Sequence, residues 1–167
     1  MLEGIVVRPL KRLNDERGAF TELLRKDWKD LLGKDCPVQA NFSVTYPGMI
    51  RAWHRHVRDQ IDYMVVTKGS IKICVYDEET GELDEIILSG QDLQTVRVPG
   101  HYWHGFKALG DETAFLVYFT TNLYDYRDPD EERRPWNDPT IEPKSINAKK
   151  NDPRIQKPWD WNNPAHR

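Results

Sequence analysis

The sequence lacks the features that mark several common protein classes. Only two of its 167 residues are cysteines, Cys36 and Cys74, and they do not form a CxxC pair. We therefore expect two reduced thiols in a cytoplasmic protein rather than a disulfide framework. No apolar run approaches the roughly 20 residues of a membrane-spanning helix. The N-terminus also lacks the continuous apolar segment of a signal peptide, so we expect no membrane partner.

The sequence also lacks an excess of positive charge and long segments with the apolar periodicity of a helix. The net charge is −3 with 31% charged residues, which argues against a nucleic-acid partner. The lack of helical segments between strands argues against a parallel α/β fold. The length suits one domain. We expect a single domain over residues 1–167, with a core at about 5–125 and a tail at about 126–167.

Short strands separated by turn residues fill most of the expected core. Residues 38–46 alternate between apolar and polar side chains, which indicates a strand. Other strands are predicted at residues 4–13, 49–56, 61–69, 70–81, 83–90, 93–100 and 113–123. A short helix is predicted near residues 27–32, with Gly33 ending it. This pattern predicts an all-β sandwich or barrel.

The tail has a different composition. Residues 125–167 contain seven of the 11 prolines and three of the six tryptophans. Tryptophan is costly to leave in water. We therefore expect an ordered tail that packs on the core or on a partner subunit.

Three histidines form the first candidate site. Strand residues two apart project to the same side, so His54 and His56 converge. Together with His104, their spacing resembles the metal-binding motifs of the cupin superfamily. Three imidazoles suit zinc, iron, nickel or copper, but Gln60 stands where the cupin acid is usual. The residues alone allow either a metal site of these three histidines or a polar pocket without metal.

Five segments, in order, carry a closer resemblance: DERGAFTELLR, QANFSVTYPGMIRAWH, VPGHYWHGF, FLVYFTTNLYD and PWNDP. Together they are similar to the dTDP-4-dehydrorhamnose 3,5-epimerase family, a branch of the cupins that works without metal. The resemblance covers about residues 5–140. It implies a cupin-type jelly roll (double-stranded β-helix), a homodimer, no cofactor, no metal ion, and a nucleotide-linked 4-keto-6-deoxy sugar as substrate.

The resemblance also assigns roles to residues. In the family, a base removes a hydrogen from C3 and/or C5 of the sugar, and an acid returns a proton to the opposite face. His54 takes the position of the base and Tyr118 that of the acid. Arg17 is expected to serve the neighbouring subunit. The residues that match those lining the sugar and nucleotide pocket are Arg17, Glu22, Gln39, Asn41, Arg51, His56 and His104.

Two positions depart from the family pattern. Family members carry a lysine where this chain has Asp62, and an aspartate where Lys150 or Asn151 aligns. A carboxylate at position 62 repels an enolate instead of stabilising it. We hypothesise that Asp62 acts in catalysis by orienting a histidine, while Lys150 or Arg51 supplies the positive charge. A distance from Asp62 to the histidines beyond single-water reach would contradict this hypothesis.

Three other functions stay open at this point. The first is a sugar-nucleotide 3,4-ketoisomerase, whose cupin relatives carry an HxH segment similar to RAWHRH. The second is a metal-dependent cupin enzyme that uses His54, His56 and His104. The third is a sugar-nucleotide-binding module without catalysis. The segments PWNDP and QANFSVTY favour the epimerase.

Overall fold

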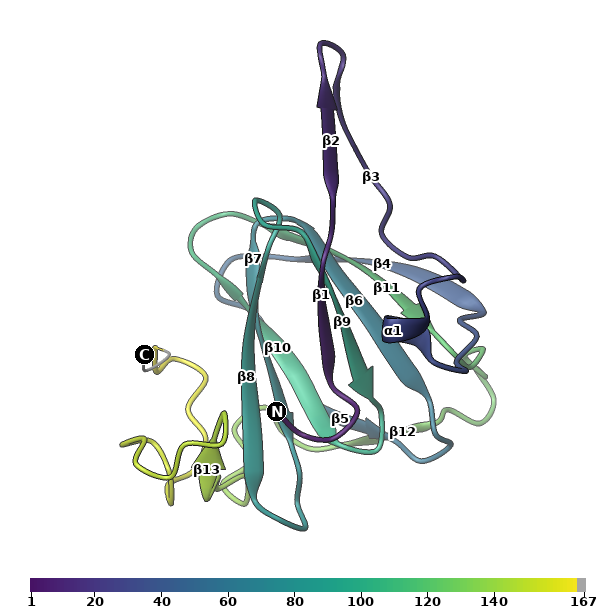
Figure 1. The fold of residues 1–167 in the computed structure, drawn as a ribbon. Helices are drawn as coiled ribbons and strands as arrows, with labels where there is room; N and C mark the ends of the chain where they lie inside the picture. Colours follow the sequence, from purple (N-terminus) through teal and green to yellow (C-terminus); the bar gives the residue numbers. More distant parts are fainter. Residues whose placement is uncertain (165–167) are drawn as a thin grey trace.

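The structure is a computed structural model that describes residues 1–164, and it consists of two facing β-sheets with a projecting hairpin (Figure 1). One sheet has the strand order β1-β9-β6-β11-β4 and the other β12-β5-β10-β7-β8-β13. Strands β2 and β3 form the hairpin. Within the described residues, only the pairing of β13 with β8 is parallel. This all-β arrangement has the expected fold class.

The elements have the following bounds: β1 Val6–Pro9, β2 Arg12–Asp15, β3 Gly18–Thr21, α1 Lys29–Leu32, β4 Gln39–Thr45, β5 Ile50–His56, β6 Ile61–Lys68, β7 Ser70–Tyr76, β8 Glu82–Ser89, β9 Gln94–Pro99, β10 Trp103–Leu109, β11 Ala114–Thr120, β12 Glu131–Arg133 and β13 Ser145–Ile146. Within the described residues, no helix is long and apolar enough to cross a bilayer.

The main apolar core lies between the two sheets, because alternate side chains of each strand point inward. Its members include Met64, Val66, Ile71, Ile73, Val75, Val96, Val98, Phe106 and Leu116. Burial of these side chains from water is the main force that holds the two sheets together. Polar side chains replace the apolar ones in part of the space between the sheets, and a pocket opens there.

The tail covers the outer face of the six-stranded sheet. Trp159 and Trp161 of the tail are buried against Trp53 of β5 and Trp103 of β10. In Figure 1 the later part of the tail, which contains β13, runs beside β8, at the opposite edge of this sheet from β12. Both faces of the six-stranded sheet are therefore buried in its middle, which explains why β7 is buried at every position from 71 to 76.

We expect loss of the Trp161 ring to destabilise the fold. The ring is 1% exposed, its centroid lies 4.8 Å from that of Trp53, and its Nε1 donates to the Trp136 carbonyl at 3.0 Å. Trp161→Ala should lower the free energy of unfolding by about 3–5 kcal/mol, as measured by urea denaturation. Trp136→Ala is the matched control, because that ring is 48% exposed and its carbonyl is retained. Equal stability of both variants would contradict the packing of the tail.

Strand β4 has a polar face toward the inside of the sandwich and an apolar face toward water. It lies at the edge of the five-stranded sheet. Its polar side chains point toward the space between the sheets, whereas the apolar Val38, Phe42 and Val44 on its other side are 52%, 62% and 39% exposed. An apolar strand face in water marks an interaction surface.

The structure refines several of the expected elements. The strand expected at residues 4–13 is divided into β1 and β2, because β1 ends at Pro9, which has no amide hydrogen to donate. The expected short helix forms at Lys29–Leu32 and is followed by Gly33 at φ 56°. Strands β12 and β13 were not predicted, since they are short and have no apolar alternation.

Candidate functional site

A pocket of about 580 Å³ opens between the two sheets. That volume suits a small-molecule ligand. Strands β4, β6 and β11 line one side, β5 and β10 the other, and residues 123–134 border it. His54 of β5 and Tyr118 of β11 therefore lie in facing sheets and line the same pocket.

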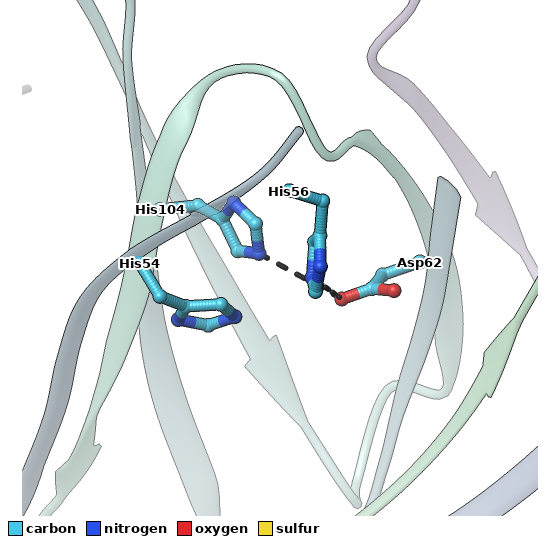
Figure 2. Close-up of side chains that lie close together, drawn as sticks. All are labelled: His54, His56, Asp62 and His104. Carbon is cyan, nitrogen blue, oxygen red and sulfur yellow. Dashed lines mark ion pairs between the residues drawn. The ribbon is translucent and has the colours of Figure 1, made fainter. Parts of the chain in front are cut away.

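The three histidines of the sequence prediction come together. His54 and His56 alternate along β5, and His104 of β10 lies opposite His54 in the antiparallel register. The ring centroids of His54 and His104 are 4.1 Å apart, and those of His54 and His56 are 5.4 Å apart (Figure 2). His104 is fully buried, so it supports the site from behind rather than lining the pocket.

Asp62 reaches the same cluster from β6 in the facing sheet. Its Oδ2 lies 3.7 Å from His104 Nε2 and 3.8 Å from His56 Nε2 (Figure 2). Both distances exceed a direct hydrogen bond but allow a bridging water. Asp62 therefore lies within reach of both histidines through one water molecule. The hypothesis that Asp62 orients a histidine requires this distance.

The carboxylate beside the histidines was not predicted as a metal ligand. Spacing alone placed Gln60 at the position of the cupin acid, whereas the structure brings Asp62 there, two residues further along the chain. Residues 60 and 62 share one face of the chain, because side chains two apart point to the same side. His54, His56, Asp62 and His104 together form the group that could hold a metal ion, with ligand atoms within 4.8 Å of one another.

Gln60 connects the two sides of the cluster. Its amide nitrogen lies 2.8 Å from Asp62 Oδ1 and 3.1 Å from His56 Nε2. Because this nitrogen carries two hydrogens, it donates one to each partner, and His56 accepts through an unprotonated Nε2. The proton of the His56 ring then sits on Nδ1, which lies 3.2 Å from the Asp130 carbonyl oxygen.

Charge and burial shift the pKa values of His56 and Asp62. Burial lowers the pKa of His56, but the Asp62 carboxylate opposes it, with a further contribution from Asp130, and the net shift is upward. This upward shift favours a charged ring, whereas the bond from Gln60 requires a neutral one. We assign the neutral ring, because the amide nitrogen lies at hydrogen-bond distance and Asp62 does not. Burial raises the pKa of Asp62, but the imidazoles of His104 and His56 outweigh it and hold the pKa below its ordinary value.

The two facing groups of the pocket have pKa shifts that suit opposite tasks. Burial, followed by the neighbouring His104 and His56, holds the pKa of His54 well below its usual value, so the ring is neutral and can accept a proton. Burial, followed by the charge of Asp62, raises the pKa of Tyr118, so its hydroxyl keeps its proton and can donate it. A neutral base and a protonated acid thus lie in facing sheets.

Of the expected binding residues, Gln39, Asn41, Arg51 and His56 line the pocket. Gln39 donates to Asn41 Oδ1 at 2.8 Å and accepts from the Tyr124 amide at 2.9 Å, so these side chains are held in place. Arg51 donates to Thr45 Oγ1 at 3.1 Å and keeps part of its guanidinium free for an anionic ligand.

Arg17 and Glu22 do not reach the pocket of their own chain. Arg17 is exposed at the tip of the β2–β3 hairpin and pairs with Asp15 at 2.6 Å. Glu22 follows the hairpin and pairs with Arg25. The hairpin points away from the sandwich (Figure 1), which keeps these two residues outside the pocket of their own chain.

The hypothesis that Lys150 supplies positive charge to the site is wrong. Lys150 is exposed in the tail, which lies on the outer face of the six-stranded sheet, and it is not part of the pocket. Asp152 pairs with Arg154 at 2.9 Å, and Arg154 binds Glu85 at 3.1 Å, which anchors the tail. The spacing of a proline-rich tail gives no register, so the sequence could not place these residues.

Sequence reasoning missed the border of the pocket formed by residues 123–134. This border contributes Leu123, Tyr124, Tyr126, Asp130, Glu131, Arg133 and Arg134 to the lining. β12 pairs with β5 so that Arg133 lies opposite His54. The only signal in the sequence was the pair of adjacent arginines after Glu131 and Glu132, which composition alone assigned to the tail.

The chain matches the family model described as dTDP-4-dehydrorhamnose 3,5-epimerase over residues 1–159. It is 44% identical to the probable low-salt glycan biosynthesis epimerase Agl13 of Haloferax volcanii, over 81% of this chain and 88% of that protein. It is 35% identical to the spore coat polysaccharide biosynthesis protein SpsL of Bacillus subtilis, over 84% of this chain and 94% of that protein.

The fold is similar to that of a solved enzyme with a bound sugar nucleotide. The dTDP-6-deoxy-D-glucose-3,5-epimerase RmlC of Legionella pneumophila, in complex with dTDP-4-keto-L-rhamnose, superposes with a TM-score of 0.74 at 25% identity. The match covers 95% of this chain and 83% of that one. The expected cupin-type fold is confirmed, and the comparisons indicate a sugar-nucleotide epimerase, as expected. The chain belongs to the dTDP-4-dehydrorhamnose 3,5-epimerase family.

Proposed function

We propose that this protein epimerises a nucleotide-linked 4-keto-6-deoxy sugar in deoxysugar biosynthesis, at C3 and/or C5. The observation that carries the proposal is the position of His54 and Tyr118 in facing sheets on one pocket. Inversion at carbon requires a base on one side of the sugar ring and an acid on the other. Membership of the epimerase family supports the same reaction.

The roles follow from the chemistry of the substrate. The 4-keto group acidifies the hydrogens on C3 and C5, because the charge left after deprotonation moves onto the carbonyl oxygen. His54 removes one of these hydrogens through a neutral ring nitrogen. Tyr118 then delivers its hydroxyl proton to the same carbon from the opposite side, which inverts the centre.

Binding of the nucleotide part is proposed for the polar border of the pocket. Arg51 lines the pocket and supplies positive charge for a diphosphate. Arg133 and Arg134 also line the pocket, where Arg133 pairs with Glu131 and Arg134 with Glu78 and Asp138. Gln39 and Asn41 on β4 offer amide groups to sugar hydroxyls or a base. Together these residues give the pocket one side suited to charge and one suited to hydrogen bonding.

Solvent deuterium exchange tests the proposed function. The protein is incubated in D₂O with 4-keto-6-deoxy sugars linked to dTDP, UDP, GDP or CDP, and loss of the C3 and C5 proton signals is followed by NMR. We expect exchange and a new product with at least one of them. The same sugar nucleotide reduced to the 4-hydroxyl is the control and should not exchange. Binding without exchange of any keto sugar would contradict the proposal and support a binding module.

We also propose a homodimer, in which the exposed apolar face of β4 lies at the interface and the β2–β3 hairpin reaches the other subunit. Phe42 and Val44 on β4 and Phe20 on the hairpin are exposed in the single chain. Burying such residues favours association. This arrangement would bring Arg17 to the partner's pocket.

A charge placed on the β4 face tests the dimer. We expect Phe42→Asp to convert the dimer into monomers, as measured by light scattering after size-exclusion chromatography. Ile87→Asp on β8 is the matched control, because Ile87 is also exposed, at 46%, but lies on the other sheet. A wild-type monomer, or a dimer that survives Phe42→Asp, would contradict the proposed interface.

A cytoplasmic location is proposed from the two thiols. Cys36 and Cys74 are both free, and Cys74 is buried. Free cysteines are usual in a reducing compartment.

A further inference from the structure

The inner end of the pocket holds three groups that converge without sharing a hydrogen bond. His56, Asp62 and His104 come from β5, β6 and β10, and they are 5%, 2% and 0% exposed (Figure 2). Asp62 Oδ2 lies 3.7 Å from His104 Nε2 and 3.8 Å from His56 Nε2. The three groups therefore surround one small, buried, polar space.

The ring protons of both histidines are engaged outside this space. His104 Nδ1 lies 2.8 Å from the Tyr102 carbonyl oxygen, and His56 Nδ1 lies 3.2 Å from the Asp130 carbonyl oxygen. A carbonyl accepts only an N–H, so each ring carries a proton on Nδ1 and directs its Nε2 inward. Histidines that bind metal ions typically donate their other N–H to a carbonyl in this way.

His104 marks the part of this space that no hydrogen-bond donor of the described residues reaches. Its Nε2 is buried without a hydrogen-bond partner among residues 1–164. The atom facing it is a carboxylate oxygen, which also accepts and cannot donate. Two buried acceptors that face each other are costly unless a positive charge or a donor lies between them.

We propose that His56 Nε2, Asp62 Oδ2 and His104 Nε2 bind a divalent first-row transition metal ion. Two imidazoles and one carboxylate with open positions form a recognised site for such ions. Asp62 is prepared for this role, since Gln60 donates to its other oxygen, Oδ1, at 2.8 Å. The contact of Gln60 with His56 Nε2 is replaced by the ion.

His54 stays outside the set of ligands. It is the least buried of the four residues that could hold a metal ion, and it lines the pocket beside the substrate space. A three-residue site thus leaves His54 free to act as the base.

The ion deepens the proposed function, and this step rests on that function. A charge of +2 bound to the single Asp62 carboxylate leaves net positive charge at the inner end of the pocket. Such a charge polarises a carbonyl oxygen and stabilises the charge that develops on it. Without the ion, the Asp62 carboxylate opposes that charge.

Metal binding is tested in the absence of sugar. Protein made without a histidine tag is stripped with EDTA and titrated with Zn²⁺, Mn²⁺ and Co²⁺ by calorimetry, with elemental analysis after dialysis. We expect one ion per chain, visible absorption bands with Co²⁺, and a higher melting temperature of the loaded protein. Less than about a tenth of an equivalent for every ion, well below the one-to-one binding expected of a built site, would overturn the proposal.

Variants assign the ligands. Asp62→Asn and His104→Gln should each weaken binding by at least about 100-fold, more than loss of a supporting partner does. His101→Gln is the matched control, because His101 is exposed on the turn before β10 and should bind as the wild type does. His54→Gln should also keep its ion. Loss of the ion in His54→Gln, or unchanged binding in Asp62→Asn, would overturn the assignment.

Activity separates the two proposals. If the stripped protein epimerises at the rate of the loaded protein, the role of the ion in catalysis is overturned while the proposed function stands. If the loaded protein binds the ion but exchanges no keto sugar, the proposed function fails while the metal site stands. We expect the stripped protein to be at least about tenfold slower and to recover when the ion is returned.

Discussion

We expect His54→Gln to lower the rate of epimerisation by about 10²–10⁴-fold, the range for loss of a general base. Glutamine keeps a polar side chain of similar reach but cannot accept a proton from carbon. His54 lines the pocket, and burial beside His104 and His56 holds its pKa well below the usual value. The variant should therefore bind the sugar nucleotide and fail to deprotonate it. NMR of product formation gives the rate, and calorimetry gives the affinity.

Two comparisons make this prediction specific. His101→Gln removes an exposed histidine on the turn before β10, outside the pocket, and should react as fast as the wild type. Thermal unfolding of His54→Gln should match the wild type within a few degrees, since the ring is not part of the apolar core. Epimerisation at more than about a tenth of the wild-type rate would remove His54 from the role of base.

Tyr118→Phe should lower the rate of inversion by about 10²-fold or more, because phenylalanine has no proton to return. Tyr118 lies on β11 in the sheet that faces His54, and burial and Asp62 raise its pKa so that the hydroxyl stays protonated. Loss of one hydroxyl leaves the ring and its packing in place. Product formation in H₂O, followed by NMR, measures the effect.

Tyr46→Phe is the control for Tyr118→Phe. Tyr46 is 70% exposed in the turn between β4 and β5, and it is not part of the main pocket. Its loss of a hydroxyl should leave the rate of inversion unchanged. Inversion by Tyr118→Phe at the wild-type rate would show that another group returns the proton.

Most of the fold could be predicted from the sequence because strand alternation and turn residues are local signals. β4 to β9 and β11 lie within a few residues of where those signals placed them, whereas no range was predicted for β10. These local signals do not show which face of a strand is buried within the folded sheet. The alternation in residues 38–46 predicts two faces but does not reveal that the polar face lines the pocket and the apolar face is exposed.

The candidate site was predicted in part. His54 and His56 share a face of one strand, which the spacing of two residues dictates. That Asp62 enters the same cluster depends on the packing of β6 opposite β5 and β10, which no local pattern specifies. The prediction that Lys150 lies at the site was wrong for the same reason. The packing of the tail determines where Lys150 lies, and no local pattern specifies that packing.

Asp62 changes meaning once its neighbours are known. In the sequence it stands where a positive charge was expected and argues against activity. In the structure it faces two inward-directed imidazole nitrogens at 3.7 and 3.8 Å. Those nitrogens and the carboxylate together suit a cation, which would restore positive charge at the inner end of the pocket.

The central claim is that His54 and Tyr118 act on one carbon from opposite faces, and deuterium washout in Tyr118→Phe tests it most directly. The variant is incubated in D₂O with the reactive 4-keto sugar nucleotide, and the recovered sugar is examined by NMR. The account predicts that deuterium enters the recovered substrate without inversion, because His54 still removes the hydrogen, exchanges it with D₂O and returns a deuteron to the same face. Inversion that keeps pace with deuterium incorporation would contradict it.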